Sequence, residues 1–213
     1  MLRWIAWNLF LAAVPVGLAA MIGWGAGGKG RKRRLPSVLL IAIALVWLAF
    51  LPNTCYLLTE WRHLLFDARW EAVLDAGHVD RGAMLSTAKW SLFFLAYSGS
   101  GVLLFALAIR PVEGLLRARG YPPYLYAPFF FALVSFGVYL GLIVRLNSWD
   151  LVTRPEYVWQ VTVDSLASTR ILAAVGAFAL ILWGLYEAVD LWVDGVAGRL
   201  RAWGVVSAPR GRA

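Results

Sequence analysis

Charged residues are scarce in this sequence, at 15% of 213 positions. Soluble domains usually carry about 25% charged residues. Hydrophobic residues make up 61% of the chain and the mean hydropathy is +0.69, which is more apolar material than a water-soluble core of this size can bury. The shortage of charge therefore argues against a soluble globular protein and favours a chain whose apolar side chains face lipid.

Cysteine is almost absent too, since Cys55 is the only one. A single thiol excludes an internal disulfide and any metal site built from several cysteines. A small buried thiol is the plain interpretation of this residue. The sequence also lacks a glycine-rich phosphate loop, a nucleophile motif and a cofactor motif, so we expect no cofactor.

What the sequence does contain is five apolar segments of about the 20 residues that a helix needs to cross a bilayer. They cover residues 4–24, 38–58, 90–109, 124–144 and 171–189. Connections are short and no internal repeat is visible. We therefore predict an all-α, polytopic membrane helix bundle of about five transmembrane helices with short interfacial helices. It would form a single integral membrane domain over residues 1–213.

The first apolar segment could also be a signal peptide, because Arg3 precedes it and residues 18–20 resemble a cleavage site. A cluster of basic residues follows directly, within residues 29–34. Such a cluster tends to stay in the cytoplasm and to hold the segment as an anchor. We expect a retained helix.

The distribution of basic residues predicts an orientation. With residues 25–37 in the cytoplasm, the N-terminus lies outside, the C-terminus is cytoplasmic, and 12 of the 20 basic residues but 4 of the 12 acidic ones lie inside. We predict a multi-pass protein of the cell (inner) membrane whose basic inner loop attracts anionic lipid. The net charge of +8 could instead indicate nucleic acid binding, but the basic residues lie between apolar spans, so no nucleic acid partner is expected.

Two local patterns predict how the helices end and pack. Thr153 and Glu156 have the spacing of a capping box, which predicts a short interfacial helix starting at Thr153. Gly137 and Gly141 form a GxxxG pattern, on which another backbone can pack closely. We expect internal packing rather than dimerisation, with the small residues of 98–101 or 173–177 as matching surfaces. A homo-oligomer or an unknown membrane partner stays open.

Two polar strings each close an apolar span on the same predicted side. One is LPNTCYLLTEWRHL at residues 51–64, and the other is GVYLG at 137–141 followed by RLNSWD at 145–150. Together they resemble the domain of unknown function family numbered 1361, whose members are uncharacterised, mostly bacterial membrane proteins. Thr54 and Cys55 stand where Ala and Pro would be expected. The resemblance implies a multi-spanning membrane protein and no established activity.

The first string would place several polar groups together. If the helix continues past Pro52, steps of about 100° per residue put four side chains within an arc of about 60°. These are Tyr56, Glu60, His63 and Asp67. Pro52 would also free a backbone carbonyl near Phe50 or Thr54, which Asn53 could satisfy.

The second string ends the fourth span at the same depth. Ionisable groups at membrane depth tend to be paired or functional. Arg145 would pair with Glu60 or with Asp150, and spans two and four would then pool their polar groups.

Three functions fit these residues. In the first, they are caps, ion pairs and interface anchors that fix the helix ends. In the second, they bind or transport a small polar ligand or a lipid headgroup, with Asn53, Tyr56, Arg145 and Asn147 as the candidate ligand-binding residues.

The third function is an outward-facing membrane enzyme, whose candidate catalytic residues are Glu60, His63, Asp67 and Asp150. Glu60 and His63 are also candidate metal ligands, because Glu-x-x-His is a carboxylate–imidazole pattern found in helical bundles. One copy of that pattern is a weak signal. Whether the chain is an enzyme, a transporter or a structural subunit is open at this stage.

Overall fold

The computed structural model describes residues 2–27, 32–60, 81–147 and 149–205, and every regular element in these ranges is helical. The predicted all-α fold class is confirmed. The elements follow one another along the chain as α1 (Leu2–Ala26), α2 (Ser37–Phe50), α3 (Pro52–Tyr56), the 3-10 helix η1 (Leu57–Glu60), α6 (Arg81–Ala118), α7 (Pro123–Leu142), α8 (Asp150–Thr153), α9 (Pro155–Leu166) and α10 (Thr169–Ala202).

Five helices of the described chain are long and apolar enough to cross a membrane. The segments that qualify are Ile5–Ala26, Ser37–Thr59, Arg81–Ala118, Pro123–Leu142 and Thr169–Ala202. The helices α6 and α10 run well past the apolar segments at 90–109 and 171–189, because a helix satisfies its own backbone hydrogen bonds and need not end where the apolar run ends. The exact limits of the spans, and the single domain over 1–213, stay predictions.

The second helix continues past Pro52, as the sequence predicts. Leu51 keeps right-handed helical angles, with φ −57° and ψ −39°, and Pro52 occupies the first turn of α3. The Thr54 amide donates to the Leu51 carbonyl at 3.1 Å, so the Phe50 carbonyl lacks its usual partner. The Asn53 side-chain amide donates to that Phe50 carbonyl at 3.0 Å. The prediction that Asn53 repairs the proline break is confirmed.

Aromatic rings form the centre of the bundle. Phe105 of α6 is fully buried, and Phe131 of α7 packs against it with ring centroids 6.2 Å apart. Phe131 also lies 5.7 Å from the Tyr186 ring of α10. Three helices that are distant in sequence therefore share one core.

Side-chain hydrogen bonds join helices that the core brings together. Trp47 Nε1 of α2 donates to the Ala108 carbonyl of α6 at 2.9 Å, and Ser135 Oγ of α7 donates to the Val175 carbonyl of α10 at 2.8 Å. Helices in a bilayer associate through close packing and such bonds, because lipid tails are as apolar as the helices themselves. These two bonds therefore join α2 to α6 and α7 to α10 in addition to the packing of the core.

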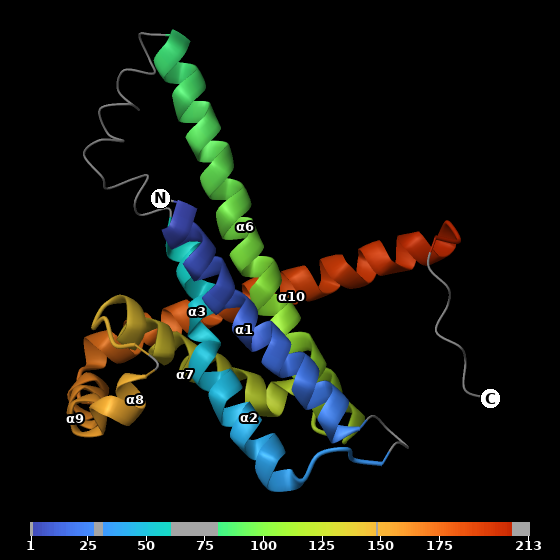
Figure 1. The fold of residues 1–213 in the computed structure, drawn as a ribbon, viewed down its shortest axis with the longest axis vertical. Coiled ribbons are helices and arrows are strands. Elements are labelled where there is room, and N and C mark those ends of the chain that lie inside the picture. The colour runs from blue at the N-terminus through green and yellow to red at the C-terminus, as the bar shows by residue number, and fades with distance from the viewer. Residues whose placement is uncertain (1, 28–31, 61–80, 148, 206–213) are drawn as a thin grey trace.

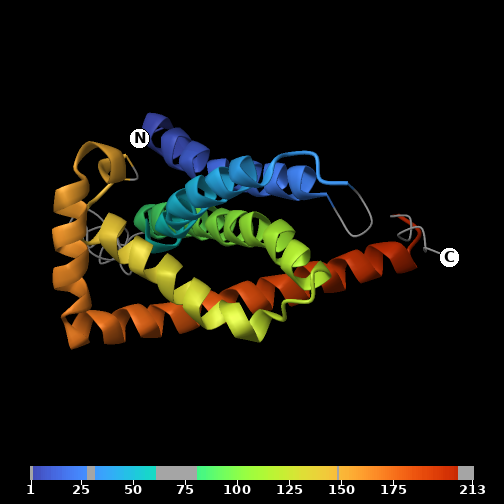
Figure 2. The ribbon, with the colours of Figure 1, turned by 90° about the horizontal axis from the view of Figure 1, so that it is seen from below.

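Consecutive long helices run in opposite directions, which is clearest when Figure 1 is compared with Figure 2, so the bundle has two ends. At one, the Tyr56 end, α3 packs on the last turns of α7, since Gly137 faces Pro52 and Gly141 faces Tyr56. At the other, the Arg110 end, Arg110 of α6 contacts α10. The ends of the second and fourth long helices thus lie on one shared side.

Two parts of the chain extend beyond the shared core. Figure 1 shows the first turns of α6 and the last turns of α10 projecting away from the other helices, and Figure 2 shows α9 running across the start of α10. The apolar side chains of α9 include Trp159, which is 71% exposed, and Val163 and Leu166, which are also exposed. The short amphipathic helix that the sequence predicts is present; its place in a membrane interface stays a prediction.

Candidate functional site

The glycine pattern of α7 is the contact surface for α3. A Cβ added at Gly137 would lie 2.7 Å from Pro52 Cγ, and one added at Gly141 would lie 1.6 Å from the Tyr56 hydroxyl oxygen. Only glycine leaves room for these two side chains. The expected internal packing role of the two glycines is therefore confirmed.

The partner of this glycine surface differs from the one expected. A Cβ added at Gly99 of α6 or at Gly176 of α10 would meet nothing within 4 Å. Gly101 of α6 instead packs against the segment that contains Pro52 and Tyr56. A Cβ added at Gly101 would lie 2.7 Å from Leu57 Cβ. Residues 52–58 are thus held between glycines of α6 and α7. The expected pairing of glycine-rich faces between spans is wrong, because the irregular α3–η1 segment needs the space.

The predicted polar stripe changes at η1. The α-helix ends at Tyr56, and residues 57–60 wind as a 3-10 helix, which advances about 120° per residue instead of about 100°. Four such steps rotate position 60 by about 80° away from the stripe that a continuous α-helix would make. Tyr56 is the only member whose side chain the structure describes. The Glu60 side chain, His63 and Asp67 lie outside the described residues.

No group of three or more histidine, cysteine, aspartate or glutamate side chains suited to a metal occurs in the described part of the chain. Because His63 is outside it, the catalytic and metal hypotheses for Glu60, His63, Asp67 and Asp150 stay predictions.

A tight turn follows α7 at the Tyr56 end. Arg145 takes left-handed backbone angles with φ 66°, and the Leu146 amide donates to the Leu140 carbonyl at 3.0 Å. Few residues other than glycine adopt this conformation. It reverses the chain so that Asn147 and Asp150 fold back beside α7.

Asp150 organises this turn. Its carboxylate accepts hydrogen bonds from the Asn147 backbone amide at 2.7 Å and from the Arg154 guanidinium at 2.8 Å. Asp150 as a whole is only 2% exposed. These contacts hold the pKa of the Asp150 carboxyl below its usual range. The hydrogen bond from the Asn147 amide has the larger effect, and the hydrogen bond from Arg154 has the next largest. Asp150 is therefore an ionised anchor of the turn.

Two expectations for this turn are corrected. Asp150 pairs with Arg154 and not with Arg145, because one turn of helix brings Arg154 back over the carboxylate while Arg145 is exposed at the reversal. The helix α9 starts after Arg154, without a side-chain cap. Thr153 still belongs to α8 and donates to the Trp149 carbonyl at 3.2 Å, so the predicted capping box is wrong.

A cavity of about 250 Å³ lies beside this turn. Tyr56 and Asn147 are the polar residues among its lining side chains, and the rest of the wall is apolar, including Leu140, Leu146 and Leu151. The cavity joins two of the four candidate ligand-binding residues. Asn53 is used for the Phe50 carbonyl, and Arg145 does not line the cavity.

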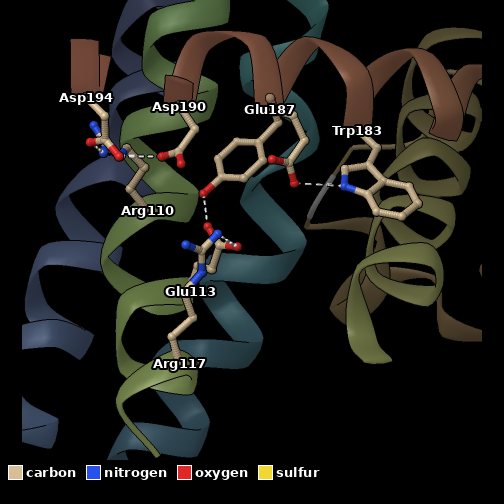
Figure 3. A network of polar contacts seen from close by, with 8 residues as sticks. Arg110, Glu113, Arg117, Trp183, Glu187, Asp190 and Asp194 are labelled. Atoms are coloured by element: carbon tan, nitrogen blue, oxygen red, sulfur yellow. Dashed lines mark hydrogen bonds and ion pairs between the residues drawn. The ribbon is translucent and has the colours of Figure 1, made fainter. Parts of the chain in front are cut away.

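A second polar cluster lies at the Arg110 end, between α6 and α10 (Figure 3). Arg110 Nε bonds Asp190 at 2.7 Å, and Arg110 also bonds Asp194. Figure 3 shows Arg110 placed between these two carboxylates. One guanidinium thus joins the C-terminal third of α6 to the extension of α10.

Glu113 and Tyr186 continue the same cluster. Glu113 is 7% exposed, accepts Arg117 Nη2 at 2.8 Å, and accepts the Tyr186 hydroxyl. Glu187 accepts Trp183 Nε1 at 3.0 Å. We name Arg110, Glu113, Arg117, Tyr186, Glu187, Asp190 and Asp194 the Arg110 cluster.

The Arg110 cluster was not predicted from the sequence, where its charges were only counted among the basic and acidic residues of the cytoplasmic side. A signal was present, since Arg110, Glu113 and Arg117 recur every three or four residues along α6, as Glu187, Asp190 and Asp194 do along α10. That spacing places each set on one helix face. The sequence does not show that the two faces meet.

The family described as "Protein of unknown function (DUF1361)" matches residues 7–184, which is most of the chain. The match includes the whole Tyr56 end and the α6 half of the Arg110 cluster, and it stops just before Tyr186. The resemblance seen in the two polar strings is confirmed. Neither the curated proteins nor the solved structures contain a match.

Proposed function

This chain belongs to the DUF1361 family of proteins of unknown function, and on that premise we propose that it is a multi-pass membrane protein which binds a lipid headgroup at its Tyr56 end. The observation that carries this proposal is the cavity of about 250 Å³ at that end. Its walls are apolar and its polar residues are Tyr56 and Asn147, so it suits a molecule with one polar part and one apolar part.

The surroundings of the cavity support a lipid rather than a fully polar ligand. Leu45 and Leu151 line it and are also more than half exposed, so the apolar wall continues onto the outer surface of the bundle. An acyl chain can follow this surface while the headgroup lies at the turn. Arg145, exposed on the same turn, adds a cation for a phosphate.

The orientation in this proposal follows the basic residues. The Tyr56 end lies outside, the Arg110 end and the basic loop after α1 lie in the cytoplasm, and anionic lipid is attracted to that loop. Arg34 packs over the Trp24 ring at 5.1 Å, which is a typical arrangement for residues in a membrane interface.

Cysteine accessibility tests the orientation. Cys55 is the only cysteine of the sequence, so Cys55→Ala provides a background without thiols. Single cysteines at positions 60 and 152 should react with an impermeant maleimide in intact cells, whereas a cysteine at position 201 should react only after lysis. Labelling of 60 and 152 in opposite compartments would overturn the proposed arrangement.

Native mass spectrometry tests the binding site. We expect the purified protein to retain phospholipid, and Leu140→Trp, which fills the cavity, to remove it. Leu107→Trp is the matched control, because Leu107 is 49% exposed on α6 and does not line the cavity. Arg145→Ala should lower the retention of phosphatidylglycerol more than that of phosphatidylethanolamine.

Equal lipid retention by Leu140→Trp and Leu107→Trp would refute a headgroup site at the Tyr56 end. If the turn has only a structural role, the two variants should retain lipid equally. In that case Asn147→Ala and Arg145→Ala would change the melting temperature without changing which lipids remain bound.

A further inference from the structure

A second cavity, of about 290 Å³, lies toward the Arg110 end between α2, α6, α7 and α10. Its accessible surface is almost wholly apolar. Trp47 and Phe130 form part of its wall, and their rings stack with centroids 5.8 Å apart. Glu113 also lines it, but the Glu113 carboxylate already accepts hydrogen bonds from Arg117 and from the Tyr186 hydroxyl. The cavity therefore suits a hydrocarbon and not the polar part of a ligand.

The second cavity adjoins the cavity of the proposed headgroup site. Leu48 of α2 and Leu133 of α7 line both of them. Along α7, residues that line one or both cavities recur every three or four positions, at Phe129, Leu133, Phe136 and Leu140. That spacing places them on one face of the helix. The two cavities therefore lie along one groove between α2 and α7.

This groove is open to the outer surface of the bundle and is long. Leu45, Phe129 and Leu133 line it and are exposed, so a chain of the surrounding lipid can enter it from the side. From Leu140 to residues 126–130, α7 extends about 15–21 Å, at 1.5 Å per residue. One leaflet supplies half of a hydrocarbon core of about 30 Å. A chain must therefore reach the middle of the bilayer or pass it to fill the second cavity.

We propose that the ligand of the Tyr56 end is a long-chain phospholipid, one of whose acyl chains lies in this groove and ends in the second cavity; this inference rests on the proposed headgroup site. A long chain makes dispersion contacts with the Trp47 and Phe130 rings, whereas a short chain leaves the second cavity empty and forfeits them. The chain is surrounded by hydrocarbon before it binds, so close packing, rather than escape from water, gives the preference for length.

Two phospholipids with the same headgroup test this preference. The purified full-length protein is incubated with equal amounts of didecanoyl and dioleoyl phosphatidylglycerol, and native mass spectrometry measures which lipid is retained. We expect the dioleoyl lipid to be retained in preference to the didecanoyl lipid. Equal retention of the two would overturn the long-chain inference, although it would leave the headgroup site standing.

A cavity-filling variant shows whether the preference arises in the second cavity. Val112 of α6 lines that cavity and not the first one, whereas Leu107 on the same helix lines neither. Val112→Phe should lose the preference for the dioleoyl lipid, and Leu107→Phe should keep it. If Val112→Phe does not fold, Leu116→Phe fills the same cavity from the next turn. An unchanged preference in the filled variant would place the chain elsewhere and refute the inference.

Leu140→Trp separates a failure of this inference from a failure of the headgroup site. If both are correct, Leu140→Trp removes both lipids, and Val112→Phe removes only the discrimination between them. Loss of lipid in Leu140→Trp with an unchanged preference in Val112→Phe keeps the headgroup site and rejects the groove. Retention in Leu140→Trp with a lost preference in Val112→Phe rejects both, because the chain then enters the second cavity from the Arg110 end.

Discussion

The hydroxyl oxygen of Tyr56 lies against the backbone of Gly141, so close that a Cβ at position 141 would be 1.6 Å from it. The contact joins α3, just after the proline break, to the last turn of α7. It explains why a GxxxG pattern stands at the end of the fourth long helix. It also positions Tyr56 beside the turn that Asp150 organises.

The first prediction concerns this contact. Gly141→Ala should destabilise the protein by about 1–3 kcal/mol, because the methyl group displaces the Tyr56 ring from a packed site. Gly99→Ala is the matched control: it lies within α6 with nothing within 4 Å, and alanine there should stabilise the helix by about 0.5–1 kcal/mol. Thermal unfolding in detergent measures both. A melting temperature that is unchanged in Gly141→Ala would contradict the packing.

The second prediction concerns the repair of the proline break. Asn53→Ala removes the donor to the Phe50 carbonyl and should cost about 1 kcal/mol of stability. Asn53→Asp keeps the shape but cannot donate, so it should be at least as destabilising. Ser100→Ala is a suitable comparison, because the Ser100 hydroxyl donates to the Tyr97 carbonyl of its own unbroken helix. If Asn53→Ala proves no worse than Ser100→Ala, the repair has no energetic role.

The third prediction concerns pH and Asp150. Its pKa is lower in the folded protein than in the unfolded chain, so its contribution to stability is complete above about 3.9, the unfolded value, and is lost as the pH falls through the folded value. Asp150→Asn should therefore melt below the wild type at pH 5–7. That difference should shrink as the pH falls below about 4.

Melting curves recorded at steps from pH 7 to pH 3 measure this difference. Asp164→Asn, which changes an exposed carboxylate on α9, provides the control and should follow the wild type over the range. A gap between wild type and Asp150→Asn that stays constant down to pH 3 would show that the ionised carboxylate does not stabilise the turn.

The fourth prediction ranks the two arginines of the Arg110 cluster. Arg110→Ala leaves Asp190 and Asp194 unpaired and should cost about 1–3 kcal/mol. Arg117→Ala should cost less than about 1 kcal/mol, since the Arg117 side chain is 49% exposed and Glu113 keeps the Tyr186 hydroxyl. Thermal unfolding of the two variants under the same conditions decides the order. The reverse order would show that Glu113, and not the two aspartates, holds α6 to α10.

Several local features could be predicted from the sequence because neighbouring residues decide them. The five long helices follow from apolar run length. The continuation past Pro52 and the bond from Asn53 to Phe50 depend on residues three or four apart. Thr153 shows the limit even at short range: its hydroxyl donates back to the Trp149 carbonyl, and that alternative competed successfully with the capping box.

The amino-acid sequence by itself determined the helical fold class, the positions of the long apolar helices and the family, because these depend on composition, periodicity and short strings. Only the tertiary structure decided the partners: Gly141 against Tyr56, Asp150 with Arg154, and Arg110 with Asp190. Periodicity defines the face on which a side chain lies, but not which other helix meets that face. That choice depends on how the helices rotate and cross when they pack, and the two cavities arise from the same packing.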